Sequence, residues 1–481
     1  MPVITASIDP VTRIEGHLKV DIKVDTVNGV QQVVDAFATG TLFRGFEKIM
    51  ENRDPRDATI ITSRICGVCP TSHSMAAALA LDAAGGVNGG DNARLLRNLV
   101  HGACFLESHL LHFYLLCLPD YVSALPVAPW LPGWEMGSRL DKGLVARFQR
   151  SLVAAIRLRR QAHEMGAIFG GKLPHTPGYI AGGFTAYVNS ADKAAFGAYL
   201  SELIQFIKTV YIPDVDVLAS ALPEYFSIGR GYGNLLSYGV FETNNNIANP
   251  TLFLPRGRIV NGNPVVMPVD PAKITEHVTW SWYSNADNDR SPAVADTVPQ
   301  NPKGNAYSWL KAPRYDSQPY ECGPLARMMV LGQYTHGVSV MDRHRARAKE
   351  ALLLAEEMES WRQALALNTS AYSPWTIPTG TVSATGLTEA PRGALGHWLS
   401  IQNSKLSHYQ VITPTCWTIS PRDSQNQRGP LEQALIGTPI ENVDKPIEAL
   451  RVVHSVDPCL DCATHVMRAE PGAKVFALGG V

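Results

Sequence analysis

The stretch Arg64–His73, RICGVCPTSH, carries two cysteines three positions apart at a point where the sequence pattern changes. The residues before Cys66, ATIITSRI (58–65), are rich in β-branched side chains and predict an extended segment. The residues after Cys69 are rich in alanine and predict a helix. The first cysteine should therefore precede the helix and the second should lie in its opening turn, where free backbone amides and the helix dipole stabilise thiolates.

A second pair, Cys459 and Cys462, stands in HSVDPCLDCATHV (454–466), far along the chain from the first. Two CxxC pairs can hold one zinc ion through four thiolates, but structural zinc usually joins nearby segments. A redox dithiol is less favoured, because the short strand–helix unit of thioredoxin-like proteins is missing around these motifs. Spacing alone therefore predicts metal binding by all four cysteines. Soft thiolates leave zinc, copper(I), nickel and iron open.

The composition is that of a folded chain without a strong electrostatic field. Of 481 residues, 45% are apolar and 18% charged. The balance of 42 basic against 43 acidic residues offers no basic surface for nucleic acid. No window approaches the ~18 uninterrupted apolar residues that a spanning helix needs, so we expect no direct membrane insertion.

The first residues lack the charged-then-apolar layout of a secretion signal. Eight cysteines are few for a chain of 481 residues, which disfavours a disulfide framework and suits a reducing compartment. We therefore expect a cytoplasmic location, with any membrane association supplied by a partner subunit.

Periodicity predicts a mainly α fold with minor β structure: a large helical-bundle core, a small N-terminal antiparallel sheet and an irregular β-containing insertion. Alternating residues predict two strands, 17–27 and 27–40, with a turn at Asn28-Gly29. Residues 228–320 are rich in Gly, Asn, Pro and aromatic side chains and form the expected insertion. No repeat or flexible linker interrupts the pattern, so we expect one domain over residues 1–481. The predicted long helices span 91–119, with Asp91 as the cap, 141–170, 190–211, ending before Pro213, and 341–367.

The residues around the cysteines carry a family resemblance. RxCGxCxxxH and DPCxxCxxH occur together with seven further strings, and their number and order argue against chance. The chain resembles the large, catalytic subunit of [NiFe] hydrogenases over nearly its whole length. The seven strings are RIEGH (13–17), FRGFE (43–47), SHLLHFY (108–114), GGKLPH (170–175), GPLAR (323–327), EAPRGALGHW (389–398) and PTCWTISPRD (414–423).

The resemblance implies a nickel-iron centre whose iron carries cyanide and carbon monoxide. Cys66 and Cys459 match terminal nickel ligands, and Cys69 and Cys462 match thiolates that bridge nickel and iron. The implied reaction is reversible, heterolytic oxidation of H₂ to protons and electrons, which we expect to run in the uptake direction. The proton would first reach the sulfur of Cys459.

Two further residues are implied to act in catalysis. Glu15 in RIEGH matches a glutamate that relays the proton from that terminal cysteine, and a carboxylate can both accept and donate one. On composition alone it would be an exposed carboxylate at a strand end. Arg392 in APRG matches a guanidinium over the open metal position, although an arginine in this context more often forms an ordinary salt bridge.

Four residues are implied to surround the centre. Thr415 and the backbone at Pro391 would face the cyanides, because buried anionic nitrogens need hydroxyl and amide donors. His73, four positions after Cys69, would donate to a bridging thiolate, whereas a lone helical histidine is usually a satisfied core or surface residue. Asp457 would complete the polar surroundings.

The resemblance also implies a second metal. Glu47 and His465 match ligands of magnesium or a similar divalent cation, although the two residues predict nothing by themselves. Three positions depart from the family pattern. Ser108 stands where some members have an aspartate, and Cys416 and Thr418 stand where threonine and asparagine are common.

The electrons that the implied reaction releases from H₂ need a partner protein to accept them. Cys104, Cys117, Cys322 and Cys416 are scattered singly and form no iron-sulfur motif, so iron-sulfur clusters are expected only in a partner small subunit. The resemblance further implies maturation chaperones and an endoprotease that removes residues 466–481 as a C-terminal propeptide. Two alternatives remain: an H₂-sensing regulatory subunit, which usually lacks such a tail, and a metal-free quinone-site scaffold related to a respiratory complex I subunit, which would not need the four cysteines.

Overall fold

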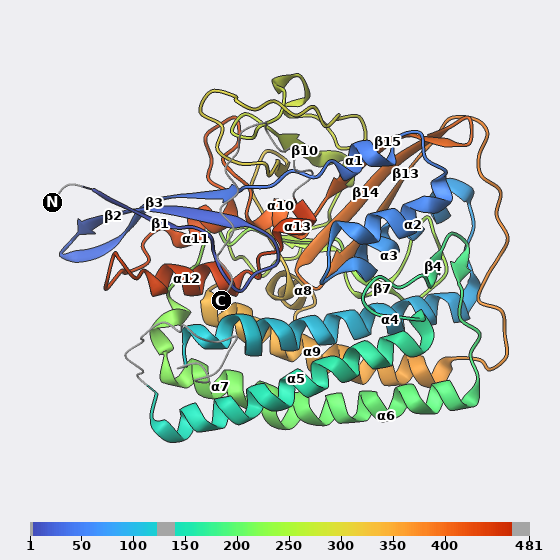
Figure 1. Cartoon of the computed structure of the whole chain (residues 1–481), viewed down its shortest axis with the longest axis horizontal. Helices are drawn as coiled ribbons and strands as arrows, with labels where there is room; N and C mark the ends of the chain where they lie inside the picture. Colours follow the sequence, from blue (N-terminus) through green and yellow to red (C-terminus); the bar gives the residue numbers. More distant parts are fainter. Residues whose placement is uncertain (1–2, 123–139, 464–481) are drawn as a thin grey trace, which may run out of the picture.

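Long helices form one side of the molecule. The computed structural model describes the backbone of residues 3–122 and 140–463 and the side chains as far as residue 461. In Figure 1 four helices lie side by side in the stretches where the sequence shows helical periodicity. α4 packs on α5 and α9, and α6 also packs on both of these. The four are α4 (Gly90–Leu110), α5 (Lys142–Gly170), α6 (Ser190–Phe206) and α9 (Val340–Ala364).

The ends of these helices follow local capping chemistry. The side chain of Asp141 accepts a hydrogen bond from the backbone N–H of Leu144 at 2.9 Å and starts α5. Gly171, with φ of 77°, ends it. α4 begins at Gly90, one residue before the predicted cap, so Asp91 lies inside the first turn. There its negative charge still interacts favourably with the positive end of the helix dipole.

Two helices continue through π-helical turns beyond their α-helical ends. η3 (Leu111–Cys117) extends α4, and η5 (Ile207–Tyr211) joins α6 to α7 (Ile212–Ala221). The predicted end before Pro213 is therefore wrong. Pro213 falls in the first turn of α7, directly after the π-helical turn, so the backbone hydrogen-bond pattern changes where proline has no N–H to donate.

The N-terminal sheet is antiparallel and has the order β1-β2-β3. β2 (Leu18–Val27) alternates buried and half-buried side chains, and β3 (Val30–Gly40) pairs with it. Asn28 and Gly29 both have positive φ, 52° and 80°, as a two-residue hairpin turn requires. The sequence does not predict β1 (Ile4–Ile8), which adds the outer strand.

Residues 58–65 are helical and not extended, so that prediction is wrong. α2 (Ala58–Ile61) and η2 (Thr62–Ile65) follow η1 (Pro55–Asp57), whose start is capped by Asp54. The hydroxyl of Thr62 donates to the carbonyl of Ala58 at 2.7 Å, and both helical turns pack on α3 (Pro70–Gly85). Burial against α3 thus overrides the β propensity of the branched side chains.

A three-stranded antiparallel sheet packs on α3 and was not predicted. Its strands are β13 (Val382–Ala390), β14 (Gly393–Gln402) and β15 (Lys405–Ile412), and Figure 1 shows it lying above the helical layer. Nearly every residue of β14 is buried, so the strand lacks the polar alternation of a half-exposed strand. At Gly386 a Cβ would lie 2.0 Å from the carbonyl oxygen of Ala76, so this close helix–sheet contact requires glycine.

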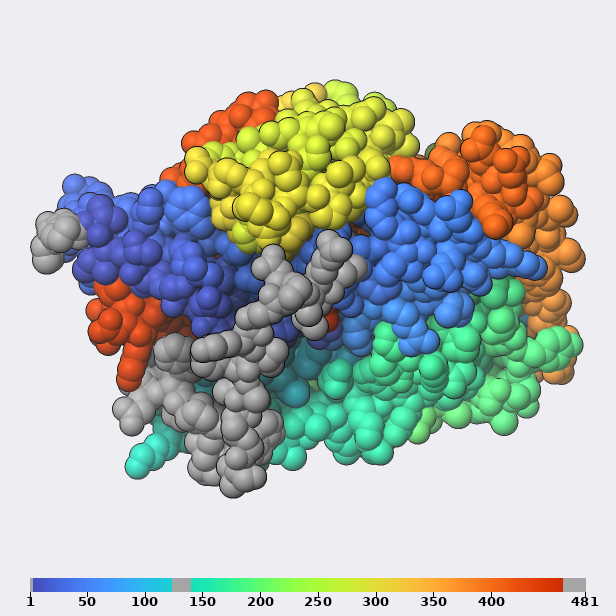
Figure 2. Space-filling model, turned by 45° about the horizontal axis from the view of Figure 1, so that its top comes forward, coloured from blue at the N-terminus to red at the C-terminus, as the bar shows by residue number. Residues whose placement is uncertain are grey.

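Short strands fill the expected insertion, which Figure 2 shows in yellow above the blue N-terminal segments. They are β6 (Leu235–Ser237), β7 (Val240–Glu242), β8 (Leu252–Leu254), β9 (Gly257–Ile259), β10 (Ile274–His277) and β11 (Ala312–Tyr315), and β12 (Glu321–Cys322) follows directly after the insertion. The remaining strands and helices are β4 (Tyr179–Ile180), β5 (Gly183–Phe184), α1 (Phe46–Met50), α8 (Pro324–Val330), α10 (Pro414–Thr418), α11 (Pro430–Leu435), α12 (Ile447–Ser455) and α13 (Leu460–Ala463). Single-turn helices complete the set: η4 (Leu118–Asp120), η6 (Pro223–Phe226), η7 (Pro271–Lys273) and η8 (Asn285–Asp287).

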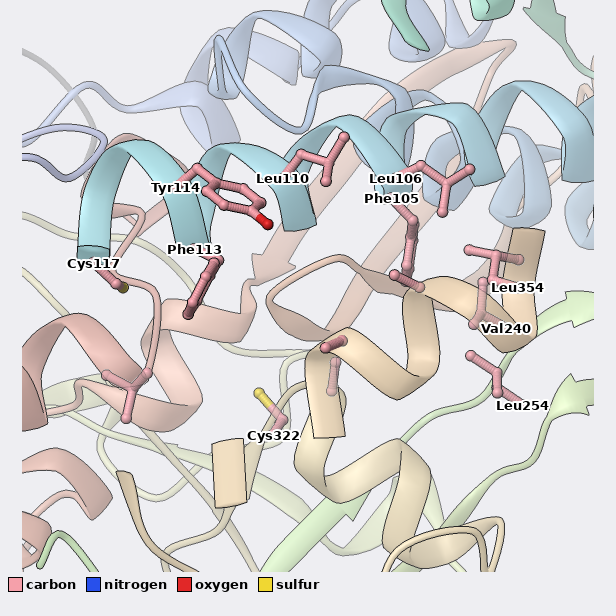
Figure 3. Packing of buried hydrophobic residues seen from close by; sticks show 14 of the residues in the cluster. Phe105, Leu106, Leu110, Phe113, Tyr114, Cys117, Val240, Leu254, Cys322 and Leu354 are labelled. Carbon is pink, nitrogen blue, oxygen red and sulfur yellow. The ribbon is translucent and has the colours of Figure 1, made fainter. Parts of the chain in front are cut away.

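The main core lies between the helical layer and the strands above it. In Figure 3, Phe105 of α4 and Leu354 of α9 lie beside Val240 and Leu254 from the short strands, within the same buried cluster. None of the described helices has the length and apolar character of a membrane span.

Candidate metal centre

The first cysteine pair lies at the junction of two helical segments. Cys66 ends η2 in an extended conformation, and Cys69 is the residue that precedes the first turn of α3. The backbone N–H groups of Val68 and Cys69 donate to the sulfur of Cys66 at 3.2 and 3.1 Å. Amide donors of this kind stabilise a thiolate, as the sequence pattern predicts.

The first cysteine of the second pair lies against the first pair. Cys459 directly precedes α13, and its sulfur lies 3.3 Å from that of Cys66, although 393 positions separate the two residues. The sulfurs of Cys66, Cys69 and Cys459 all lie within 4.8 Å of one another and are buried. The side chain of Cys462 lies outside the described residues, while its backbone belongs to α13.

Backbone pairing holds the two ends of the chain together. Glu15 and Cys459 form a parallel β-bridge, in which Leu460 N–H donates to the Glu15 carbonyl at 2.7 Å. At Gly16, with φ of 79°, a Cβ would lie 2.5 Å from the backbone nitrogen of Asp461. Only glycine therefore permits this approach. The guanidinium of Arg44 adds a second link by donating to the backbone carbonyls of Ile65 and Asp461.

The carboxyl group of Glu15 lies beside the sulfurs. Burial, then the negative charges of Cys66 and Asp461, raise the pKa of Glu15 to about 7, against the opposing charge of Arg392. A carboxyl group with this pKa can exchange protons near neutral pH, whereas an ordinary surface glutamate would stay ionised. The position is half-buried and not the exposed strand end that composition alone suggests.

Arg392 reaches the same place from the turn between β13 and β14. Its Nε donates to Asp457 Oδ1 at 3.0 Å, and its Nη1 donates to the hydroxyl of Ser108 at 3.4 Å. Among the described residues, its other terminal nitrogen, Nη2, has no hydrogen-bond partner. Burial lowers the pKa of Arg392, but the charges of Asp457 and the three cysteines outweigh that effect and raise the pKa well above its ordinary value.

A buried ion-pair network fixes the turn that carries Arg392. Arg327 donates to the carbonyls of Ala390 and Pro391 at 3.1 and 2.8 Å and pairs with Glu389 and Glu350. His109 also contacts Glu350, at 2.9 Å. Sequence reasoning assigned Arg327 no role, although the GPLAR string that contains it was one of the matching motifs. The role of Arg327 becomes visible only from its contacts with the carbonyls of residues 390 and 391.

The remaining predicted neighbours lie around the cysteines. The hydroxyl of Thr415 accepts a hydrogen bond from the backbone N–H of Cys459 at 3.2 Å. His73 lies one turn into α3, and its Nδ1 is 3.1 Å from Nε2 of His397. The Nδ1 of His397 in turn lies 2.8 Å from the hydroxyl of Tyr409. The sequence did not single out His397 or Tyr409.

Glu47 lies in a separate polar cluster. Its Oε1 accepts from the backbone N–H of Val411 at 3.1 Å, and its Oε2 accepts from the hydroxyl of Thr297. The ammonium of Lys311 lies 4.0 Å from Glu47 and 3.5 Å from Glu276. A cationic side chain therefore already stands beside Glu47. The second predicted ligand of this site, His465, lies outside the described residues.

The three sulfurs fit a soft metal. The 3.3 Å between the sulfurs of Cys66 and Cys459 is far beyond the ~2.05 Å of a disulfide. Buried thiolates repel one another, so a group of three needs a cation to neutralise it. Sulfur ligands select soft ions over magnesium or calcium. The donor set therefore suits a thiolate-held transition metal centre, with Glu15 and Arg392 close to it.

The family to which the sequence is similar indicates that the metal is nickel. The sequence pattern of the family described as nickel-dependent hydrogenase matches residues 44–130, 147–337 and 331–465, and a HoxL-like pattern matches residues 5–34. The chain belongs to the nickel-dependent hydrogenase family. It is the catalytic large subunit of such an enzyme, an oxidoreductase that acts on H₂, which confirms the resemblance seen in the sequence.

Individual relatives cover almost the whole chain. The periplasmic [NiFeSe] hydrogenase large subunit of Desulfomicrobium baculatum is 38% identical over 97% of this chain and 96% of its own length. The uptake hydrogenase large subunit of Rhizobium leguminosarum is 34% identical over 96% of this chain and 95% of its own. The structure of the reduced Ni-Fe-Se hydrogenase from Desulfovibrio vulgaris Hildenborough matches with a TM-score of 0.92 and 37% identity, covering 96% of this chain and 100% of that one.

Proposed function

We propose that this subunit oxidises H₂ by heterolytic cleavage at a nickel-iron centre held by all four CxxC cysteines. The observation that carries the proposal is the approach of Cys66, Cys69 and Cys459 from opposite ends of the sequence into one buried group. Cys66 and Cys459 would be terminal ligands of nickel. Cys69 and Cys462 would bridge nickel to iron. When bound, this centre supplies a redox-active nickel and an iron kept low-spin by cyanide and carbon monoxide.

The residues around the centre would handle the proton. The sulfur of Cys459 accepts it, and the carboxyl group of Glu15 then carries it away. Two observations support this role: the backbone of Glu15 is bonded to the segment that carries Cys459, and burial raises the pKa of Glu15 to about 7. The proton can therefore pass to Glu15 and leave it again near neutral pH.

Arg392 would polarise H₂ at the open metal position. Its Nε and Nη1 are fixed by Asp457 and Ser108, while its Nη2 has no hydrogen-bond partner among the described residues. A positive group held in this way stabilises developing negative charge without needing to move. At Ser108 a hydroxyl takes the place of the aspartate that some relatives have, so Asp457 would be the main carboxylate partner.

The polar residues nearby would complete the surroundings of the iron. Thr415 and the backbone at Pro391 would face the cyanides, and His73 would donate to a bridging thiolate. The contact of Thr415 with Cys459 and the position of His73 one turn after Cys69 support these roles. The pair that His73 forms with His397 would fix the orientation of its ring.

A second cation, magnesium or a similar ion, would bind Glu47 and His465 and tie the end of the chain to its beginning. The burial of Glu47 supports a charged partner there, and Lys311 supplies part of that charge. Elemental analysis of the wild-type protein and of Glu47→Gln tests the site. One magnesium equivalent lost in the variant is expected; equal magnesium in both proteins would assign the charge compensation to Lys311.

The electrons would pass to a small subunit that holds the iron-sulfur clusters, because the described cysteines outside the centre are not clustered as such a cofactor requires. The names of the relatives as large subunits support a heterodimer. Maturation chaperones would insert the metals. An endoprotease would then remove residues 466–481, and the end of the family match at residue 465 supports that boundary.

Infrared spectroscopy of the mature heterodimer tests the centre, since cyanide and carbonyl stretches fall where polypeptide does not absorb. H₂-dependent dye reduction, compared with H₂ evolution from reduced dye, tests the direction. Faster oxidation is expected; faster evolution would reverse the proposed direction. An intact centre with negligible turnover would favour the H₂-sensing subunit, and a protein without nickel would favour the quinone-site scaffold.

A further inference from the structure

Three buried side chains form a line of hydrogen bonds from the β13–β15 sheet to α3. The hydroxyl of Tyr409 lies 2.8 Å from Nδ1 of His397, and Nε2 of His397 lies 3.1 Å from Nδ1 of His73. The exposed fraction is 0% for both histidines and 2% for Tyr409. The roles proposed above use the inner end of this line, His73. They leave the outer end, Tyr409, without a role.

The sheet places the first two members of the line. His397 in β14 pairs with Val411 in β15, and Tyr409 stands two positions before Val411, so the two side chains are diagonal neighbours on one face. α3 packs on β14, as Figure 1 shows, and carries His73 one turn after Cys69. The line of hydrogen bonds therefore leads from the sheet towards the proposed metal centre.

The surroundings of Tyr409 make its hydroxyl a donor. Its one hydrogen-bond partner among the described residues is Nδ1 of His397. The residue belongs to a buried cluster of apolar side chains that includes Leu399 and Leu406. Burial raises the pKa of Tyr409, so the hydroxyl keeps its proton. A buried O–H without an acceptor costs free energy, because its hydrogen bonds with water are lost. The hydroxyl therefore donates to His397 and does not accept from it.

This donation fixes where His397 carries its proton. Burial, and then the neighbouring His73, lower the pKa of His397 well below its ordinary value, so the ring is neutral and has one N–H. Because Nδ1 accepts from Tyr409, that N–H lies on Nε2 and donates to Nδ1 of His73. A histidine whose Nδ1 accepts carries its own proton on Nε2, the nitrogen on the other side of the ring.

We propose that Tyr409, acting through His397, is the positioning residue that holds the proton of His73 on Nε2. The proposal rests on the proposed function, in which His73 donates to a bridging thiolate. In the opposite arrangement His73 donates to His397 and His397 donates to Tyr409. His73 would then direct a lone pair at a negatively charged sulfur, and the Tyr409 proton would have no acceptor among the described residues. A doubly protonated His73 would leave that hydroxyl proton without an acceptor in the same way.

The relay gives Tyr409 an influence on the bridging sulfur. Consecutive hydrogen bonds polarise one another, so a stronger donor at Tyr409 makes Nε2 of His73 a stronger donor as well. An N–H that is donated to a thiolate draws electron density from it, and such a thiolate donates less to a metal. The carbonyl stretch of an iron centre reports this donation, because its wavenumber falls as the iron becomes richer in electrons.

Infrared spectra of the mature heterodimer test the relay. The wild type, Tyr409→Phe and a chain with a ring-fluorinated tyrosine at position 409 are compared in the same redox state. Tyr409→Phe removes the donor, so we expect the carbonyl stretch to move to lower wavenumber. Fluorination makes the hydroxyl a stronger donor, so we expect a move to higher wavenumber. A merely structural role of Tyr409 would not produce shifts of opposite sign.

Tyr121→Phe is the matched control. Tyr121 is also buried, its hydroxyl also meets a histidine nitrogen, Nε2 of His344 at 3.5 Å, and it belongs to neither the proposed metal centre nor the relay. The bands of this variant should match those of the wild type. A shift equal to that of Tyr409→Phe would overturn the relay, because loss of any buried hydroxyl would then suffice.

Two further results would contradict the relay: an unchanged carbonyl stretch in Tyr409→Phe, or shifts of the same sign in both proteins altered at position 409. If Tyr409→Phe does not fold, the fluorinated chain decides alone, because an unchanged stretch there contradicts the proposal. Nickel and iron are measured on the same samples. A wild-type protein without nickel or without cyanide and carbonyl bands would refute the proposed function itself, whereas intact bands that do not respond to Tyr409 refute the relay alone.

Discussion

Glu15 and Cys459 are joined backbone to backbone, so the segment that carries the last cysteines is placed by a residue near the start of the chain. The carboxyl group of the same residue lies close enough to Cys66 for the negative charge of that sulfur to raise the pKa of Glu15. One short strand-like contact thus sets both the position of a proposed ligand and the position of its proposed proton acceptor.

Cys459→Ser should abolish H₂ turnover and lower the nickel content, because a serine hydroxyl is a harder and less acidic ligand than a thiol. Cys416→Ser is the matched control, since Cys416 is a buried thiol outside the group of three sulfurs. It should retain nickel. Elemental analysis with H₂-dependent dye reduction measures both effects, and near-normal turnover in Cys459→Ser would refute the assignment of this ligand.

Glu15→Gln should keep nickel and iron but slow proton release. Glutamine has nearly the same shape and cannot carry a proton, and loss of an acid–base group typically costs about 10²–10⁴ in rate. The rate of exchange between H₂ and deuterated water reports the step directly. Glu15→Asp should recover part of the rate. An unchanged exchange rate in Glu15→Gln would remove this residue from the relay.

Gly16→Ala should weaken assembly of the metal centre more than Gly29→Ala. The two glycines have almost the same φ, 79° and 80°, so both variants suffer similar backbone strain. They differ in the space available for a side chain. A Cβ at Gly16 would lie 2.5 Å from the backbone nitrogen of Asp461, whereas none of the described atoms would lie within 4 Å of a Cβ at Gly29. Nickel content per chain measures the difference. Equal nickel in both variants would mean that the close contact is not needed.

Arg327→Met should destabilise the protein and disturb the turn that carries Arg392. Removing one partner from a buried ion pair costs about 3–5 kcal/mol, because Glu350 and Glu389 keep their buried charges. Arg157→Met is the surface control. Its pair with Glu202 is about half exposed, so solvent screens the two charges and loss of the pair should change the stability little. Thermal unfolding compares the two, and a similar small loss in both would show that the Arg327 network does not stabilise the turn.

The parts of the fold that sequence predicts are those governed by local chemistry. The Asn28-Gly29 turn and the caps of α5 follow from residue types that tolerate positive φ or bond to backbone amides. Residues 58–65 could not be predicted, because burial against α3 decides their helical conformation. The sheet β13–β15 was not predicted for a related reason. Its central strand is buried nearly throughout, and a buried strand lacks the alternation of apolar and polar residues that identifies a half-exposed strand.

The metal site, too, could be predicted from the sequence only in part. The CxxC pairs predict thiolate ligands, but only the structure shows Cys66 and Cys459 with their sulfurs 3.3 Å apart. Arg327 could not be found from its own residue type, since an arginine after a short apolar stretch has many uses. Its role depends on two carbonyls more than sixty positions away, which no local pattern reports.

The separation of Cys66 from Cys459 also dictates when the enzyme can be completed. A ribosome that has made most of this polypeptide has produced only the first half of the sulfur set. Loading of the inorganic core must therefore follow translation, and a nascent or prematurely terminated chain cannot carry a reactive, partly built catalyst into the cell.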